Sequence, residues 1–210
     1  MRFAFNDDQR LLAASVRDYL AKECTPDVVR AVWDTPAAGD DMWRGLAELG
    51  IVGATVPEQH GGLGLDAVDV ILAAEEAGRA ALPLPLGETV LVAGPLLIEL
   101  GEHLGDEWLP RLASGEARVA VGLPDVDPLI AYAGSAELVA IVAEDSVVVA
   151  RPEDLALRSA PTIDGGRPTW TVAPGTGQRV EAPPDIAANA LDRGVLAAAA
   201  ELTGVGLRMI

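Results

Sequence analysis

The segment VPEQHGGLGLD (residues 56–66) places three glycines within four positions, directly before a helix-like run. A glycine-rich loop can cradle a phosphate with its backbone amides, or it can turn the chain between two packed helices. The spacing matches neither G-x-G-x-x-G nor a P-loop, and no β-branched strand leads into it. Asp66 would also put a negative charge beside a bound phosphate. We therefore predict a turn that requires positive φ angles.

Around this segment the chain has 210 residues, of which half are hydrophobic. That length suffices for one large domain or two small ones with a buried core. The hydrophobic content excludes an intrinsically disordered chain.

The charge balance is strongly acidic, with 32 acidic against 15 basic residues and a formal net charge of −17. No run of basic residues is present to neutralise phosphate groups. We therefore expect no nucleic-acid partner and no binding to an anionic membrane.

Cysteine content and the N-terminus indicate the compartment. Cys24 is the only cysteine, which excludes a disulfide framework or a cysteine-based metal site within the chain. The first ten residues lack the apolar stretch of a signal peptide, and no run approaches the roughly 18 apolar residues that span a bilayer. We expect a cytoplasmic protein.

The first half of the chain reads as helices. Apolar residues recur at helical spacing, acidic or Asn residues are available as N-caps, and glycine or proline ends several runs. The predicted helical segments are residues 6–23, 40–50, 66–79, 86–100 and 105–116.

From Arg118 onward, short β-branched runs separated by Gly, Pro, Asp and Glu predict strands. Asp164 and Gly165 give a hairpin signal. From about residue 184 an alanine-rich run predicts a long helix to Ile210. The predicted strands are RVAVGL (118–123), LVAIVA (138–143), SVVVAR (146–151) and TWTV (169–172).

The predicted fold class is therefore α+β. An all-α N-terminal domain (residues 1–117) is followed by a small β domain (118–183) and by the first helix (184–210) of a C-terminal helical bundle domain.

No local motif identifies a reaction. Histidines lack ligand-spaced partners, adjacent glutamates point about 100° apart on a helix, and two carboxylates in a loop do not make a metal site. The serine lacks the G-x-S-x-G elbow. We predict no metal site and no catalytic residue in this chain. The residues set aside on these grounds are His60, His103, Glu75, Glu76, Asp125, Asp127 and Ser135.

The linear order of several short patterns is more specific. A helix ending in LAELGI (46–51), the turn VPEQHGGLG (56–64) and a helix with EEAGR (75–79) follow one another. WLPRLASG (108–115) then leads into the first predicted strand. This order resembles acyl-CoA dehydrogenases over nearly the whole chain.

The resemblance implies a helical domain, a β domain and a C-terminal four-helix domain, with FAD between the last two. It implies α,β-dehydrogenation of an acyl-CoA thioester, in which a glutamate base removes the α-proton and the flavin accepts a hydride. The electrons then pass to an electron-transferring flavoprotein. Leu123 matches the family's flavin-binding segment and is the expected cofactor contact.

Three departures from the family pattern stand out. The family's catalytic glutamate lies in the C-terminal domain, and no residue here inherits it. The family's flavin-binding L-T-E-P reads LPDV here, so Pro124 replaces a threonine and offers neither hydroxyl nor amide proton. The segment that packs on the flavin ring is reduced, with Leu129 at its tryptophan and Ala131 at its hydroxyl residue. FAD binding by this chain alone is therefore doubtful on the sequence.

Two interpretations remain open. The chain is a truncated acyl-CoA dehydrogenase, or it is a degenerate subunit of a heteromeric enzyme of the kind found in actinobacterial steroid side-chain breakdown. In either case we expect a homo- or hetero-oligomer, with residues 86–100 and 187–210 as burial surfaces. Leu91 and Val92 are candidates to border the acyl chain, although core packing also explains them. The competing class is a structural or interaction subunit that keeps the fold and binds no FAD.

Overall fold

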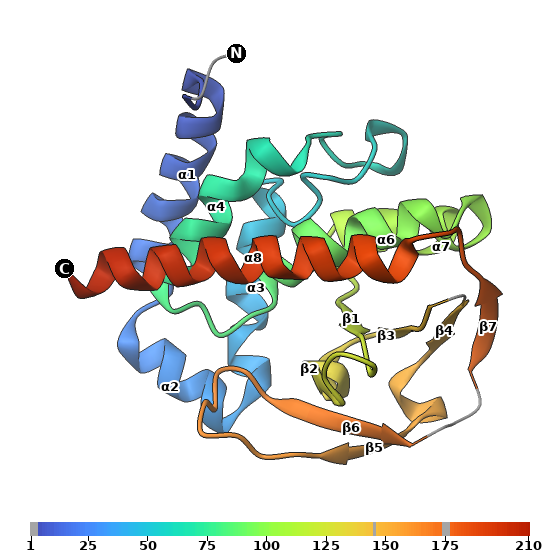
Figure 1. The fold of residues 1–210 in the computed structure, drawn as a ribbon. Coiled ribbons are helices and arrows are strands. Elements are labelled where there is room, and N and C mark those ends of the chain that lie inside the picture. Colours follow the sequence, from blue (N-terminus) through green and yellow to red (C-terminus); the bar gives the residue numbers. More distant parts are fainter. Residues whose placement is uncertain (1–3, 145, 174–176) are drawn as a thin grey trace.

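The computed structural model describes residues 4–144, 146–173 and 177–210. Helices form the N-terminal half, two small sheets follow, and the long helix α8 (Ile186–Met209) crosses both parts (Figure 1). The predicted α+β order is confirmed.

The N-terminal helices begin and end where the sequence provides caps. Asn6 and Gln9 form a reciprocal capping box at α1, and Thr25 accepts from Val28 at the start of α2. The sequence prediction missed the nine-residue helix α2, although Thr25 and Pro26 provide a helix start signal. The helices of this half are α1 (Asp7–Glu23), α2 (Pro26–Asp34), α3 (Asp40–Glu48), α4 (Ala67–Ala80), α5 (Leu86–Glu88), α6 (Gly94–Glu99) and α7 (Glu102–Ala113).

The glycine-rich segment is a turn, as predicted. Gly61 and Gly64 have φ angles of 84° and 63°, which favour glycine. A Cβ at Gly62 would lie 2.1 Å from the carbonyl oxygen of Val56, so the chain approaches itself closely here. The turn connects α3 to α4 and packs on its own backbone.

The predicted helix 86–100 contains a π-helical segment, η3 (Thr89–Ala93), between α5 and α6. In the π register Gly94 donates to the carbonyl of Thr89, but the next residue, Pro95, has no N–H for the carbonyl of Val90. The hydroxyl of Thr55 donates to that carbonyl at 2.6 Å. A side chain thus replaces the missing backbone donor and satisfies a buried acceptor.

Two sheets form the β part. One is four-stranded in the order β1-β3-β4-β7, with β1 and β3 parallel, and the other is antiparallel in the order β2-β6-β5. The strands are β1 (Val119–Gly122), β2 (Leu129–Ala131), β3 (Leu138–Val142), β4 (Ser146–Ala150), β5 (Ala156–Ser159), β6 (Thr169–Ala173) and β7 (Gln178–Glu181).

The four predicted runs coincide with β1, β3, β4 and β6. The sequence prediction missed β2, β5 and β7, since β2 has only three residues and β5 and β7 are largely exposed. Such strands lack the apolar alternation that identifies a strand. The hairpin signal at Asp164 falls in the connection between the antiparallel strands β5 and β6.

Helix α8 confirms the predicted long C-terminal helix and crosses α4 with backbone in contact. A Cβ at Gly78 would lie 2.0 Å from the carbonyl oxygen of Glu201, and one at Gly204 would lie 1.8 Å from that of Glu75. Only glycine permits this approach. The crossing joins α8 to the core of the helical half, where Ala197 and Ala200 pack.

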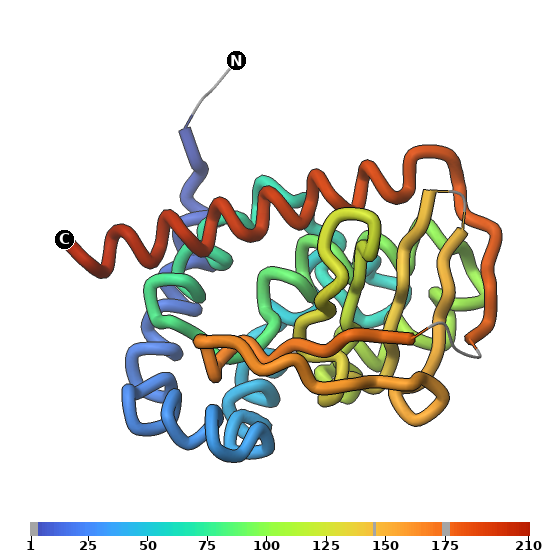
Figure 2. Tube along the Cα trace, turned by 60° about the horizontal axis from the view of Figure 1, so that its bottom comes forward, coloured from blue at the N-terminus to red at the C-terminus, as the bar shows by residue number. Residues whose placement is uncertain are grey.

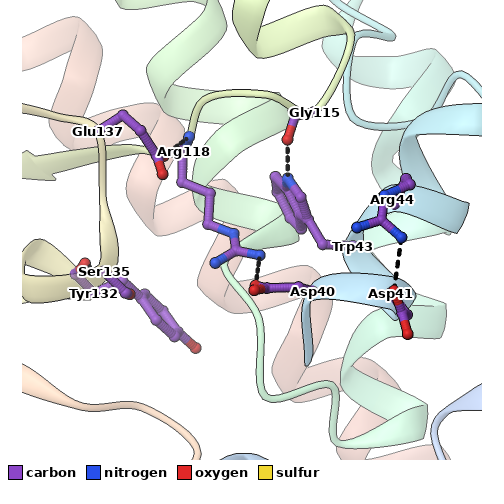
Figure 3. A network of polar contacts seen from close by, with 9 residues as sticks. All are labelled: Asp40, Asp41, Trp43, Arg44, Gly115, Arg118, Tyr132, Ser135 and Glu137. Atoms are coloured by element: carbon purple, nitrogen blue, oxygen red, sulfur yellow. Dashed lines mark hydrogen bonds and ion pairs between the residues drawn. The ribbon is translucent and has the colours of Figure 1, made fainter. Parts of the chain in front are cut away.

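A polar network links the helical half to the sheets (Figure 3). The Arg118 guanidinium contacts the Asp40 carboxylate at 2.6 Å, and the Arg118 backbone N–H donates to Glu137 at 2.6 Å. The indole N–H of Trp43 donates to the carbonyl of Gly115 at 3.1 Å. These contacts fix the point at which the chain passes from α7 into β1.

Candidate functional site

A cavity of about 450 Å³ lies between α8, the π-helical segment and the end of β1. Figure 2 shows the yellow-green connection after β1 beside the N-terminal half of α8. The residues that line the cavity are Glu88, Val92, Val121, Leu123, Arg167, Ala190, Gly194, Ala197, Ala198, Glu201, Leu202 and Val205.

Two of the three binding residues predicted from the sequence meet at this cavity. Val92 and Leu123, 31 positions apart, both line it. Leu91 is 1% exposed, packs in the core of the helical half and is absent from the cavity wall. The roles of all three residues remain predictions.

The cavity wall carries one cluster of charged side chains. The guanidinium of Arg167, from the connection between β5 and β6, forms an ion pair with the carboxylate of Glu88 at the start of the helix 86–99. Glu201 of α8 accepts a hydrogen bond from the backbone amide of Gly87. A Cβ at Gly87 would lie 2.4 Å from Oε1 of Glu201, so the carboxylate rests on the glycine backbone. Three elements that are distant in the sequence therefore meet in the Glu88–Arg167–Glu201 cluster.

The electrostatics of this cluster favour a proton on Glu201. The pKa of the Glu201 carboxyl is raised to about 7, mainly by burial and further by the carboxylate of Glu88. Arg167 and the Gly87 amide act in the opposite direction. A carboxyl with this pKa exchanges its proton near neutral pH and can donate as well as accept hydrogen bonds.

Tyr132 positions the Arg167 side chain at the edge of the cavity. Its guanidinium lies 5.8 Å from the ring centroid of Tyr132, and the Tyr132 hydroxyl donates to the carbonyl of Gly166 at 3.2 Å. Burial raises the pKa of Tyr132, which therefore keeps its proton. Since 48% of the Arg167 side chain is exposed, the cluster stands at the solvent-facing edge of the cavity.

A second hollow of about 190 Å³ adjoins the first and shares Glu88, Val121, Leu123 and Arg167 with it. It extends the space toward β2 and β6, where Thr169 and Asp127 contribute polar atoms. The two hollows together can hold a largely apolar ligand that meets the charged cluster between them.

The sequence analysis missed Glu88, Arg167 and Glu201. One signal was available, since Glu201 is the single charged residue between Val195 and Leu207. A lone acid in such a run of a long helix indicates either a partner or a site. Glu88 and Arg167 gave no comparable signal, because only the fold brings them together.

Three of the residues that the sequence analysis set aside, His60, Ser135 and Glu76, make local contacts. Ring atom Nε2 of His60 lies 3.7 Å from the Asp106 carboxylate, and the hydroxyl of Ser135 donates to the carbonyl of Tyr132. Glu76 is 4% exposed and pairs with Arg17 at 2.5 Å. Within residues 4–144, 146–173 and 177–210, no group of three His, Cys, Asp or Glu side chains is placed to hold a metal ion. No helix in these ranges is long and apolar enough to cross a membrane.

The fold and sequence have clear relatives. The chain is 28% identical over 172 residues to the acyl-CoA dehydrogenase IpdE2 of Mycolicibacterium smegmatis, which covers 81% of this chain and 53% of that protein. The solved ChsE4-ChsE5 complex of Mycobacterium tuberculosis matches with a TM-score of 0.85 at 21% identity, covering 99% of this chain and 66% of the matched chain. A variant of the Tcur3481-Tcur3483 steroid ACAD matches with a TM-score of 0.79 at 21% identity. The match covers 94% of this chain and 63% of the matched chain.

These likenesses to solved structures show the fold. The chain spans about half the length of IpdE2 and somewhat less than two thirds of the two matched chains. The family model for the N-terminal domain of acyl-CoA dehydrogenases matches residues 6–116, slightly more than half of the sequence. The chain therefore belongs to the acyl-CoA dehydrogenase family.

Proposed function

We propose that the protein is a subunit or fragment of an acyl-CoA dehydrogenase-like flavoenzyme. The reaction is α,β-dehydrogenation of an acyl-CoA thioester, with a fatty acyl or steroid side-chain acyl group. This chain supplies one wall of the acyl cavity, and the base and the flavin contacts are completed by further sequence or by a partner chain. An electron-transferring flavoprotein is the electron acceptor.

The observation that carries this proposal is the meeting of Val92 and Leu123 on one cavity. Leu123 was expected at the cofactor because it matches the family's flavin-binding segment, and Val92 was a candidate for the acyl chain as part of an apolar helix. An acyl group beside a flavin needs contacts of both kinds within one space. The small residues Ala190, Gly194 and Ala198 leave a wide wall on α8 for such a ligand.

The residues present do not fit a complete FAD site. Val121 and Leu123 suit the apolar part of a flavin ring, but the pyrophosphate needs several donors. Among the described residues that line the two hollows, the only cationic side chain is that of Arg167, which is paired with Glu88. Glu88, Glu201 and Asp127 are acidic, so the walls would repel phosphate. We therefore infer that this chain alone does not hold FAD.

The outer face of α8 supports an oligomer. Its exposed apolar side chains lie on one long helix and form a patch of the kind that marks an interaction surface. By contrast the helix 86–99 is buried within the chain, with Leu96 and Leu97 fully covered. We propose that α8 packs against another acyl-CoA dehydrogenase-like chain or domain. The exposed apolar residues of α8 are Val195, Leu196, Leu202, Val205, Leu207 and Met209, of which Leu202 and Val205 also line the cavity.

The second candidate is a non-catalytic structural subunit that keeps the fold and binds no FAD. The acidic cavity walls favour it, and the ChsE4-ChsE5 neighbour is itself a complex of two named proteins. In this alternative the cavity has no ligand, and α8 serves only assembly.

The visible absorption spectrum of the purified protein tests the cofactor statement. We expect no flavin band from the chain alone, and a band at near-stoichiometric FAD would overturn the conclusion that these walls do not hold it. Co-expression with the neighbouring gene product, followed by dye reduction with fatty acyl-CoA and steroid acyl-CoA thioesters, tests activity. A complex without flavin or activity favours the structural subunit.

A matched pair of glycines tests the cavity itself. A Cβ at Gly194 or at Gly206 of α8 would meet nothing within 4 Å, but only Gly194 lines the cavity. Gly194→Leu should weaken thioester binding about tenfold or more by occupying the space, while Gly206→Leu should leave it unchanged. Equal affinities in both variants would place the acyl group elsewhere.

A further inference from the structure

The Glu88–Arg167–Glu201 cluster is an exception on the wall of an otherwise largely apolar cavity. Of the 12 described residues that line the cavity, only these three are charged. They come from the start of the helix 86–99, from the connection before β6 and from α8. A ligand that fills the cavity therefore meets polar groups at one place and apolar groups elsewhere.

We propose that this cluster binds an uncharged hydroxyl or keto oxygen on the acyl group, and that the preferred ligands are acyl-CoA thioesters oxygenated away from the thioester. The inference rests on the proposed function, because it assumes that the cavity holds the acyl group. It names the chemical class of that group.

The inventory of donors and acceptors supports a hydroxyl. Arg167 has five N–H groups, and its contact with Glu88 engages one nitrogen. The two carboxyl groups provide acceptor oxygens beside these donors. A hydroxyl group both donates and accepts, so it is satisfied by a guanidinium and a carboxylate together. A keto oxygen accepts from Arg167 or from protonated Glu201, whose pKa of about 7 permits the second bond.

The charge of the cluster excludes a terminal carboxylate. With both glutamates ionised, two negative charges face one positive charge, and Glu88 already takes the ion pair with Arg167. An added carboxylate would lack a free cation and would be repelled by Glu88 and, above pH 7, also by ionised Glu201. A plain alkyl chain is disfavoured for another reason, since it would cover the polar groups without bonding to them.

A purely structural role is the competing explanation, because the ion pair between Arg167 and Glu88 also joins the β part to the helical half. Ligand discrimination separates the two explanations. Substituting a structural ion pair changes the stability of the fold, whereas substituting a ligand-binding group changes the ratio of affinities among matched ligands.

The test measures dissociation constants of the purified protein, with any partner that co-purifies, for three kinds of thioester. These are octanoyl-CoA, hydroxyoctanoyl-CoAs with the hydroxyl at successive carbons, and suberyl-CoA, which ends in a carboxylate. We expect at least one hydroxylated thioester to bind about tenfold or more tighter than octanoyl-CoA, and suberyl-CoA to bind more weakly than both.

Variants then assign the preference to the cluster. Arg167→Gln should reduce the hydroxyl preference to near one. At pH 8, where Glu201 is ionised, Glu201→Gln keeps the shape and the acceptor for Gly87 and removes a charge, so suberyl-CoA should bind more tightly than in the wild type. Glu99→Gln is the matched control, since Glu99 pairs with Arg193 of α8 at 2.6 Å and does not line the cavity. Circular dichroism and thermal unfolding verify that each variant is folded.

Each outcome is decisive. Similar affinities for octanoyl-CoA and every hydroxylated thioester would overturn the inference and leave the proposed function standing. A hydroxyl preference that survives Arg167→Gln would also overturn it. Failure of all thioesters to bind would overturn the proposed function and the inference together.

Discussion

Two faces of α8 use glycine for opposite purposes. At the crossing with α4, the positions of Gly78 and Gly204 leave no space, because an added Cβ would meet a backbone carbonyl at about 2 Å. On the cavity wall, a Cβ at Gly194 would meet nothing within 4 Å. The first face fixes the helix by backbone contact, and the second leaves room for a ligand. Structural constraint and candidate function are thus separated on one helix.

The largest expected effect comes from adding a side chain at the crossing of α8 with α4. In Gly204→Ala the new methyl would lie 1.8 Å from the Glu75 carbonyl oxygen and 2.7 Å from the Arg79 nitrogen, both backbone atoms. We expect a loss of about 2–4 kcal/mol in the free energy of unfolding, measured by urea denaturation.

Gly206→Ala is the control for this prediction, since it changes the same helix two residues away in open space. It should be neutral or stabilising by about 0.5–1 kcal/mol. If Gly204→Ala costs no more than Gly206→Ala, α8 does not depend on the close crossing.

The next effect concerns the helix that supplies Val92 to the cavity. Thr55→Val has nearly the same shape but removes the donor to the Val90 carbonyl, which Pro95 cannot replace. Leaving this buried acceptor unpaired should cost about 1–3 kcal/mol of unfolding free energy.

Thr203→Val provides the comparison, because the Thr203 hydroxyl donates to the Ala199 carbonyl at 2.8 Å on the exposed face of α8. Water can satisfy that carbonyl, so chemical denaturation should show almost no change. Equal losses in the two variants would mean that the Thr55 bond has no special part in holding the π-helical segment.

A third effect depends on pH. The pKa of Glu201 is 4.5 ordinarily and about 7 in the folded protein, so the folded state holds its proton more tightly. Between these values the unfolded chain loses the proton first, and the free energy of unfolding decreases as pH rises. Below pH 4.5 both states are protonated, and well above pH 7 both are ionised, so the loss is then complete.

Glu201→Gln removes this dependence. Urea denaturation should find the variant close to the wild type at pH 5 and more stable at pH 8 by about 1–2 kcal/mol, a figure reduced for partial solvent screening. Glu88 and Arg167 face Glu201 and keep their own interactions in the variant. Glu99→Gln should show no gain at pH 8. The absence of any gain in Glu201→Gln would mean that the cluster accommodates the ionised carboxylate without cost.

The two faces also differ in what the sequence could predict. Local patterns were sufficient for most helices, for four strands and for the turn at Gly61 and Gly64, because caps, periodicity and glycine conformations act over a few residues. The crossing at Gly78 and Gly204 was not foreseen, since neither glycine marks a turn and each is required by a helix distant in sequence. Likewise Val92 and Leu123 came from the family resemblance, and nothing in the sequence brings Glu88, Arg167 and Glu201 together.

The smallest effect tests the open face. Gly194→Ala adds a methyl where no atom lies within 4 Å, and alanine loses less backbone entropy than glycine when it becomes helical. Thermal and urea unfolding should both show a gain of about 0.5–1 kcal/mol. Because Gly194 lines the cavity, the same variant should bind bulky thioesters slightly more weakly while being more stable. A loss of stability would show that Gly194 is packed like Gly204, and the difference between the two faces of α8 would then disappear.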